Sequence, residues 1–364
     1  MKRLCPMTRR TFMASAGAGL AGTLLSSSCG ADRNAGPAGL LDPLGDLGQS
    51  AVAPTSGRRP GLTSSDSRIP MRSLGNTGLE ISILGHGGGS QFLVLGEGDW
   101  QAELENAVQA GVNIFDTSPP SSSYGPNGES EKRYGQILSE KYRDKVILST
   151  KVDSRIVMEA ETQIEGSFQN LRTDVIDILM IHGLEPYDDL SGIISDNGVW
   201  GLMKRLKEEG RVRFIGASVM YDPGVALAFA HQAEPDVLLL AMNPFTKGSG
   251  TPYADFEDSA LAEIRGLGIG VMTMKALRDM VGTGPSLMSV DKLLGYNWSM
   301  DVSTVLVGHT KLSELEYNLE LAATQHQPTG LSPEELAWIR RRAQQHSLVP
   351  CWMKPGYRRH ELKT

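Results

Sequence analysis

Eight strand-like apolar runs alternate with helix-like segments along the chain, and this alternation constrains the fold more than any other feature. The runs are short and apolar, and they occupy residues 81–84, 112–115, 146–149, 176–181, 212–215, 237–242, 270–274 and 305–307. Strand–helix alternation is typical of parallel sheets, and eight repeats predict an α/β protein with a (β/α)8 barrel, the TIM-barrel architecture. A doubly wound open sheet is the competing fold, but the GHGGG run at 85–89 lacks the spacing of a dinucleotide fingerprint.

Segments with helical apolar spacing fill the intervals between these runs. They lie at residues 100–110, 129–141, 159–171, 199–209, 223–232, 257–267 and 312–324, with a weaker pattern at 288–298. Before the first interval, the turn sequence GNTG at 75–78 separates residues 71–74 from 79–84 and predicts a short N-terminal hairpin. After the last, Pro333 followed by Glu334 and Glu335 predicts a C-terminal helix to about residue 345 and then a tail.

The chain ahead of the barrel has the layout of an export signal and a tether. Residues 1–30 contain a basic start, the sequence TRRTFM with Arg9 and Arg10, and a short apolar run, which together resemble a twin-arginine signal. Residues 31–69 are rich in Gly, Pro, Ala and Ser and predict a disordered linker. The barrel is expected over 70–331, and a helix and tail over 332–364 pack on it. We therefore expect a periplasmic or membrane-anchored protein that meets the twin-arginine export machinery.

Charge and cysteine content narrow the function classes. A net charge of −7 and the lack of a basic stripe disfavour nucleic-acid binding. The three cysteines are Cys5, Cys29 and Cys351, so the barrel has no disulfide framework and no cysteine metal site. Cys29 follows LLSSS, which partly resembles a lipobox, and lipid attachment there remains open against simple cleavage or an uncleaved anchor.

Polar residues end three consecutive predicted strands, and a tyrosine follows in the loop after the first of them. Asp116 ends one strand, Lys151 the next and His182 the one after, while Tyr124 lies in the loop after Asp116. A barrel of this kind collects catalytic groups at the carboxyl ends of its strands. A lysine that ends an apolar strand needs a partner in the core, and Asp116 is the obvious one.

These residues suit proton transfer to a carbonyl oxygen. A phenol with a reference pKa of about 10 is a poor acid at neutral pH unless a cation stabilises the phenolate. We expect Lys151, held by Asp116, to lower the pKa of Tyr124, and His182 to orient or polarise the carbonyl. Each residue has a plainer interpretation as a surface tyrosine, a structural histidine or a structural ion pair. Their joint occurrence at neighbouring strand ends favours catalysis.

The region from Met71 to about Ala323 resembles the aldo-keto reductase superfamily. The resemblance is carried, in order, by RSLGNTGLEISILGHGG, NIFDTS, YG, GESEKRYG, LSTK, DILMIH, EEGRVRFIGAS, GIGVMTMKAL and VSTVLVGHTKLSELEYNL. It implies a reductase of aldehydes, ketones or sugar-like carbonyls in which Asp116, Tyr124, Lys151 and His182 match the catalytic tetrad. It also implies a nicotinamide dinucleotide bound without a Rossmann fold. The family's usual NADP(H) is favoured over NAD(H), which stays open because Glu314 is an anion beside the expected adenosine ribose.

The same resemblance carries over the family's cofactor contacts. Ser218 matches the residue at the nicotinamide carboxamide, and Lys275 lies in a segment like the one that covers the pyrophosphate. The cofactor floor, VLLLAMNPF, is atypical of the family, and Asn243 or Phe245 is a candidate to compensate there. The adenosine end would be held by Gly308, Thr310, Lys311, Glu314 and Asn318. A helix N-terminus with a nearby lysine suits phosphate, although Lys311 and Glu314 could instead form an ordinary i,i+3 pair.

Two departures from the family pattern bear on catalysis. The loop from Asp116 to Tyr124 carries PPSSS and is about one turn longer than usual, so Tyr124 reaches the site only if residues 119–123 bulge outward. The family's glutamine falls on Leu239 and its stacking aromatic on Met242. These departures motivate an alternative, a catalytically weak cofactor-binding barrel that acts as a sensor or accessory protein. A metal-dependent hydrolase or lyase is disfavoured, because no His/Asp/Glu cluster stands at ligand spacing and no metal site is predicted.

Overall fold

The computed structural model describes residues 69–121, 124–186, 188–245, 255–277, 288–324 and 331–345, and all structural statements below concern these residues. The predicted signal, nearly all of the linker, the three cysteines and the final tail lie outside them, so those interpretations stay predictions. Within the described ranges, no helix has both the length and the apolar character needed to cross a bilayer.

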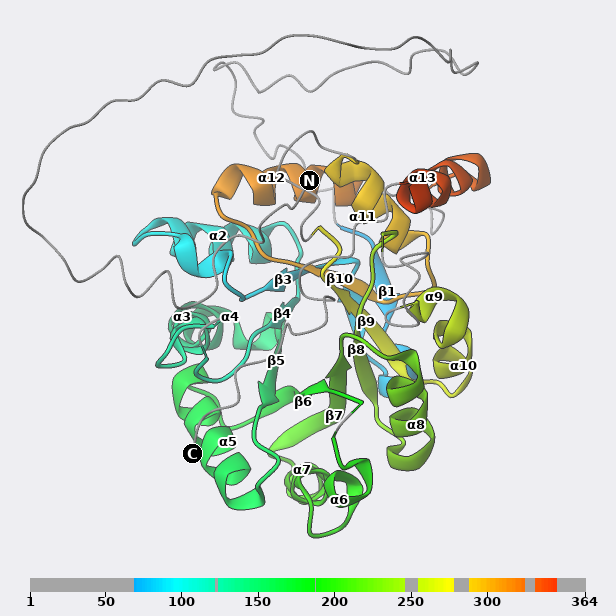
Figure 1. Cartoon of the computed structure of the whole chain (residues 1–364). Helices are drawn as coiled ribbons and strands as arrows, with labels where there is room; N and C mark the ends of the chain where they lie inside the picture. Colours follow the sequence, from blue (N-terminus) through cyan, green and yellow to red (C-terminus); the bar gives the residue numbers. More distant parts are fainter. Residues whose placement is uncertain are drawn as a thin grey trace, which may run out of the picture. The chain divides into compact units, whose positions relative to one another are not determined.

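Eight parallel strands close into a barrel, as the alternation predicts. Each strand pairs with its neighbours along the chain, and β10 pairs with β3 to close the ring. Figure 1 shows the strands inside an outer layer of helices. The strands are β3 (Leu84–Gly87), β4 (Ile114–Asp116), β5 (Ile147–Val152), β6 (Ile176–Leu184), β7 (Val212–Val219), β8 (Val237–Ala241), β9 (Gly270–Met274) and β10 (Thr304–Val307).

Helices follow the strands and cover the outside of the barrel. They are α2 (Asp99–Gln109), α3 (Glu129–Tyr134), α4 (Glu140–Tyr142), α5 (Val157–Leu171), α6 (Leu190–Ile194), α7 (Val199–Glu208), α8 (Pro223–Ala233), α9 (Phe256–Ser259), α10 (Leu261–Gly266), α11 (Val290–Trp298), α12 (Leu312–Ala323) and α13 (Pro333–Gln345). A π-helical segment, η3 (Gly135–Ser139), joins α3 to α4, and short 3-10 turns are η1 (Gly75–Thr77), η2 (Phe92–Val94) and η4 (Arg143–Lys145).

The predicted N-terminal hairpin is present and plugs the amino end of the barrel. Strands β1 (Met71–Ser73) and β2 (Glu80–Ser82) pair antiparallel, and Gly78 takes the left-handed conformation at the turn, with φ 74°. Leu74 and Ile81 of the hairpin are fully buried in the interior core of the barrel. The guanidinium of Arg72 donates to the carbonyls of Trp298 and Val302 at 2.8 Å each, which ties the hairpin to the end of α11 and the loop before β10.

Three predicted element boundaries are wrong. The run at 81–84 is not the first barrel strand, because Ile81 belongs to the hairpin and the barrel strand begins at Leu84. The predicted helix at 129–141 contains the π-helical segment, and the one at 257–267 breaks at Ala260, whose φ of −142° is not helical. The short helix α6 was not predicted. Apolar spacing marks which residues are buried, but it does not mark where the backbone hydrogen-bond ladder changes.

Two apolar cores hold the barrel together. The smaller one fills the interior with side chains from the hairpin and the strands: Leu74, Ile81, Ile114, Ile147, Ile178, Met180, Val237, Leu239, Met272 and Leu306. The larger one lies between the strands and the helices. A filled interior means that the barrel is not a pore, so chemistry must take place at its carboxyl end.

Gly216 offers a test of the barrel's packing. A Cβ at this position in β7 would lie 1.9 Å from the backbone oxygen of Val237 in the paired strand β8. We therefore expect Gly216→Ala to lower the free energy of unfolding in urea by about 3 kcal/mol, since a paired backbone cannot move aside. The control is Gly166→Ala in α5, where a Cβ meets nothing within 4 Å. This substitution should stabilise the protein by about 0.5–1 kcal/mol. Equal stability of the two variants would contradict the packing.

Candidate active site

A buried ion pair joins the carboxyl ends of β4 and β5. The ammonium Nζ of Lys151 lies 2.5 Å from Oδ2 of Asp116 and also donates to the carbonyl of Thr117 at 2.7 Å. The hydroxyl of Ser149 donates to Oδ1 of Asp116 at 2.8 Å. Lys151 is 1% exposed and Asp116 is 4% exposed. The pairing expected from the sequence is therefore present, and every oxygen of the carboxylate is engaged.

The loop after β4 brings Tyr124 to this ion pair. Ser121 and Gly125 form a β-bridge, and the backbone N–H of Tyr124 donates to the carbonyl of Ser121 at 3.2 Å, so the loop turns tightly just before the tyrosine. Lys151 Nζ lies 5.6 Å from the centre of the Tyr124 ring. The extra length of the PPSSS loop, of which residues 122–123 lie outside the described part, does not carry Tyr124 away from the lysine.

His182 in β6 completes the group. Its ring meets the ring of Tyr124 edge to face, with 5.8 Å between the ring centres. Its Nδ1 faces Oδ1 of Asp153 at 2.5 Å and the hydroxyl of Ser118 at 3.3 Å. These contacts fix the orientation of the ring and direct its other nitrogen away from Asp153. A carboxylate on Nδ1 of a histidine holds the imidazole in one tautomer, which suits a role in orienting a substrate oxygen.

The predicted cofactor residues at the ends of β7, β8 and β9 lie along one side of the barrel mouth. Ser218 is buried, and its hydroxyl accepts a hydrogen bond from the backbone N–H of Gly183 at 2.7 Å. The side chain of Asn243 bridges two segments, because its Nδ2 donates to the carbonyl of Lys275 at 3.3 Å and its Oδ1 accepts from the backbone N–H of Phe245 at 2.9 Å. Asn243 therefore links the ends of β8 and β9.

Lys275 carries the backbone strain that is common at functional sites. Its φ is 66°, in the left-handed region that non-glycine residues seldom adopt. The two other described residues of this kind, Arg172 and Glu234, cap the ends of α5 and α8, where such a conformation is ordinary. Lys275 does not cap a helix, since it follows the strand β9 directly. A lysine held in a strained turn at the barrel mouth fits an anionic group such as a pyrophosphate.

The last predicted group surrounds the start of α12, just beyond β10. Lys311 is exposed and is the N-cap residue of this 12-residue helix. The carboxylate of Glu314 accepts from the backbone N–H of Thr310 at 2.7 Å and from its hydroxyl at 3.0 Å, so Glu314 caps the turn through Thr310. Gly308 lies close to the backbone of β3, where a Cβ would be 2.7 Å from the carbonyl of Gly87. Asn318 is buried and its amide faces His309.

Comparison with known proteins gives the family. The sequence profile of the aldo/keto reductase family matches residues 96–279, half of the chain. The chain belongs to the aldo/keto reductase family. It is accordingly an oxidoreductase of carbonyls and alcohols, and members of this family use NAD(P)(H).

Three relatives show how far the similarity extends. L-galactose dehydrogenase of Arabidopsis thaliana is 29% identical over 314 residues, which cover 75% of this chain and 93% of the relative. Aldo-keto reductase YhdN of Bacillus subtilis is 27% identical over 241 residues, or 60% and 68% of the two chains. The solved holo structure of aldo-keto reductase AKR11C1 from Bacillus halodurans superposes with a TM-score of 0.62 at 20% identity, covering 79% and 99%. This last likeness supports the barrel fold.

Two positions of the reductase depart from the family's cofactor floor, and both are buried. Leu239 is fully buried in the interior core of the barrel. Met242 is 3% exposed and follows β8 directly, where its backbone N–H donates to the carbonyl of Met274 at 3.1 Å. A leucine and a methionine offer apolar contact in place of an amide and an aromatic ring.

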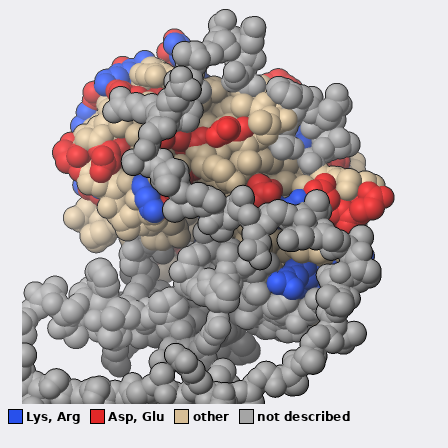
Figure 2. Space-filling view, turned by 90° about the horizontal axis from the view of Figure 1, so that it is seen from above, with Lys and Arg blue, Asp and Glu red and all other residues tan. Residues whose placement is uncertain are grey.

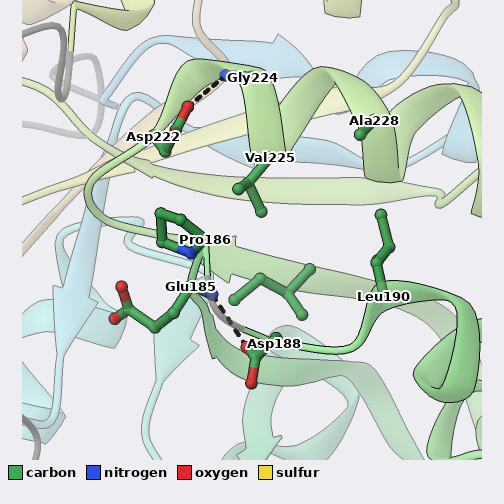
Figure 3. Close-up of a pocket in the computed structure, with 9 residues that line it drawn as sticks. Glu185, Pro186, Asp188, Leu190, Asp222, Gly224, Val225 and Ala228 are labelled. Atoms are coloured by element: carbon green, nitrogen blue, oxygen red, sulfur yellow. Dashed lines mark hydrogen bonds between the residues drawn. The ribbon is translucent and has the colours of Figure 1, made fainter.

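Two clefts that the described residues line lie elsewhere on the reductase. One, of about 320 Å³, is shown in Figure 3 between the loop after β6 and the start of α8, and its lining includes Glu185, Asp188 and Asp222. The other, of about 340 Å³, lies at the amino end of the barrel beside Gly268. Neither contains a tetrad residue. Figure 2 shows acidic side chains across the middle and at both sides of the described part of this face, with basic side chains at its left and lower right.

A buried polar cluster beside the tetrad was missed from the sequence. His86 of β3 and His309 after β10 both contact Oε1 of Glu103 in α2, at 2.9 Å and 3.0 Å. The Tyr134 hydroxyl lies 2.6 Å from Nδ1 of His86 and donates to the carbonyl of Asp116 at 3.2 Å, so the cluster contacts the carboxyl end of β4. The prediction considered ligand spacing along the chain and therefore missed this cluster, because folding brings these residues together from distant parts of the chain.

Burial and hydrogen bonding shift the titration of these groups. Burial raises the pKa of Glu103, but hydrogen bonds from His309 and His86 outweigh it and hold the pKa at about 2. Burial lowers the pKa of His86 against the opposing effect of Glu103. Burial also raises the pKa of Glu131, whose carboxyl accepts a hydrogen bond from the hydroxyl of Thr150 in β5 at 2.7 Å. The cluster thus pairs an ionised carboxylate with a histidine that favours its neutral form.

The ion pair of the tetrad can be tested through stability. Asp116→Asn leaves the buried ammonium of Lys151 without its counter-charge, which should cost about 3–5 kcal/mol in the free energy of unfolding. Adding Lys151→Met to that variant removes the stranded charge and should restore most of the loss. The measurement is urea unfolding of the two single variants and the double variant. Additive effects of the two substitutions would contradict a direct pairing.

Proposed function

We propose that this chain catalyses the NAD(P)(H)-dependent interconversion of a carbonyl and an alcohol, with Tyr124 as general acid/base. A bound nicotinamide would supply the hydride for reduction of the carbonyl carbon and accept it in oxidation. The phenol of Tyr124 would give its proton to the carbonyl oxygen in reduction, and its phenolate would take the hydroxyl proton in oxidation. Lys151 stabilises the phenolate, and His182 orients the substrate oxygen.

The observation that carries the proposal is the meeting of Tyr124, Lys151 and His182. Lys151 Nζ lies 5.6 Å from the centre of the tyrosine ring, and the rings of Tyr124 and His182 are 5.8 Å apart. Asp116 holds the lysine at 2.5 Å and Asp153 holds the histidine at 2.5 Å. A cation and an imidazole held this way against one phenol are the parts that proton transfer to a bound oxygen needs.

The nicotinamide dinucleotide would lie across the ends of β7 to β10. Ser218 and Asn243 would face the nicotinamide end, and Lys275 would pair with the pyrophosphate. Lys311 and the N-terminal N–H groups of α12 would hold the adenosine end, with the helix dipole favouring its phosphate. NADP(H) stays our favoured form. The preference rests on the family resemblance. The carboxylate of Glu314, which accepts hydrogen bonds from Thr310, is an anion at this end of the site and keeps NAD(H) as the alternative.

A sugar is the substrate class that we favour among carbonyl compounds. The L-galactose dehydrogenase of Arabidopsis thaliana is 29% identical, and the D-threo-aldose 1-dehydrogenase of a Pseudomonas species is 28% identical over 197 residues, 45% of this chain and 57% of that protein. Both names describe oxidation of an aldose. A panel of aldoses, with simple aldehydes and ketones beside it, is the direct way to define the substrate.

Replacement of Tyr124 by phenylalanine tests the central assignment. Tyr124→Phe keeps the ring against Lys151 and His182 but removes the transferable proton. We expect the turnover rate to fall by roughly 10²-fold or more, which is the usual contribution of a general acid. Cofactor binding, measured by quenching of protein fluorescence, should change little, because the phenol contributes proton transfer and not cofactor contacts.

The control variant is Tyr142→Phe in α4, which lies outside the site and should keep full activity. Undiminished turnover by the Tyr124 variant would refute the role of the phenol. The sensor or accessory function gives a different pattern, in which the wild-type protein retains NADP(H) tightly but transfers no hydride to any member of the substrate panel. Measurements on the wild-type protein alone therefore distinguish the oxidoreductase from the sensor or accessory protein.

We also propose export by the twin-arginine route, on the basis of residues 1–30. The variant with Arg9→Lys and Arg10→Lys should remain in the cytoplasm when the full chain is expressed in a bacterium, as measured by cell fractionation. The control replaces the second arginine pair, Arg58 and Arg59 in the predicted linker, by lysines and should leave export unchanged. Equal distribution of both variants would overturn the signal assignment.

A further inference from the structure

The buried cluster of His86, Glu103 and His309 has the composition of a metal site. One nitrogen of each histidine and a carboxylate oxygen of Glu103 lie within 4.8 Å of one another, and all three residues are at most 1% exposed. Two imidazoles with one carboxylate form a ligand set that proteins use for zinc and for iron(II). The three residues come from three separate elements, so the cluster is a product of the fold and not of a local helix or loop.

The carboxylate of Glu103 has an oxygen that could accept a further hydrogen bond or ligate a cation. Oε1 lies 2.9 Å from Nε2 of His86 and 3.0 Å from Nδ1 of His309, whereas the buried Oε2 has no hydrogen-bond partner. Within the described residues, the ion pairs of Glu103 involve these two histidines, and neither a lysine nor an arginine is among its partners. A buried carboxylate without a cationic partner is unfavourable. A bound cation would supply the missing charge and engage Oε2.

The far nitrogens of both histidines have partners of the kind that metal-bound histidines need. Nδ1 of His86 lies 2.6 Å from the hydroxyl of Tyr134, which can accept the ring N–H while donating its own proton to the carbonyl of Asp116. Nε2 of His309 lies 3.0 Å from the amide of Asn318, and the other orientation of that amide presents an accepting oxygen. Each histidine can therefore hold its proton on the far nitrogen and turn a lone pair toward Glu103.

We propose that His86, Glu103 and His309 bind one divalent first-row transition ion, with zinc as the natural occupant. At metal–ligand distances of about 2.0–2.1 Å, the 2.9 Å and 3.0 Å separations from Oε1 to the two nitrogens subtend about 90° at the ion. Both oxygens of Glu103 then reach the ion together with the two nitrogens. The rings of Phe92 and Phe115 pack against His86 and keep the surroundings dry.

The role of this ion is structural, because the ligands span the closure of the barrel. His86 in β3 is the register partner of Val307 in β10, and His309 follows two residues later. Glu103 comes from α2, the helix that follows β3. One ion would thus join the first barrel strand, its helix and the end of the last strand. No substrate contact is required, and the site stands apart from the proposed chemistry at Tyr124.

The metal content of the full chain tests the proposal directly. The protein is expressed without a histidine tag, purified without chelators and analysed by inductively coupled plasma mass spectrometry. We expect about one equivalent of zinc per chain, and a roughly ten-fold or greater loss in Glu103→Gln, since a carboxylate ligand is removed. The control is Glu263→Gln, which alters the exposed His231–Glu263 pair, with its 2.6 Å contact, and should leave the zinc content unchanged.

Cobalt provides a second measurement that needs no variant. Wild-type protein unfolded with a chelator and refolded with Co²⁺ should show visible absorption bands from the bound ion and a higher thermal midpoint than protein refolded without metal. Less than about 0.1 equivalent of any transition metal in the purified protein, together with no cobalt bands, would overturn the proposal. The cluster would then be a hydrogen-bonded network that shares a proton. Zinc retained in full by a folded Glu103→Gln variant would overturn it equally.

Discussion

The ion pair of Asp116 and Lys151 is the interaction on which the candidate active site depends. An ammonium that is 1% exposed is tolerable only because the carboxylate lies 2.5 Å away and the carbonyl of Thr117 accepts a second hydrogen bond. The pair spans β4 and β5, so the parallel register of the two strands determines where the positive charge stands. The loop that carries Tyr124 begins directly after Asp116 at the end of β4, and it therefore places the phenol near the ammonium of Lys151.

Much of this arrangement was predictable because strand ends follow a simple physical rule. Asp116, Lys151 and His182 each interrupt or end an apolar strand, and a charged or polar residue there must lie at the barrel mouth or be paired. The barrel was predictable from its apolar periodicity, the hairpin from its GNTG turn, and the C-terminal helix from the helix-start signal at Pro333. Ile81 shows the limit, because a residue that plugs the barrel from the hairpin has the same apolar character as one in a barrel strand.

Other residues of the site were not predictable from linear patterns. Asp153 is an acid in a loop after β5, and such acids are common, so only the 2.5 Å contact with His182 distinguishes it. The His86 cluster is harder still, since His309 and Glu103 are 206 positions apart in the chain. The available signal was a histidine at each of two strand ends, His86 and His309. The two strands, β3 and β10, become neighbours only when the eight-stranded barrel closes.

The closure between β3 and β10 has a consequence for biosynthesis. The cluster of His86, Glu103 and His309 cannot assemble until the ribosome has made the last barrel strand, because its members lie at the two ends of the barrel sequence. Until then β3 and β9 are open sheet edges, exposed to pairing with other chains. One edge of β3 can pair with β4 early, but its other edge stays unpaired until β10 has been made, so the end of synthesis is the step that commits this barrel to its native state.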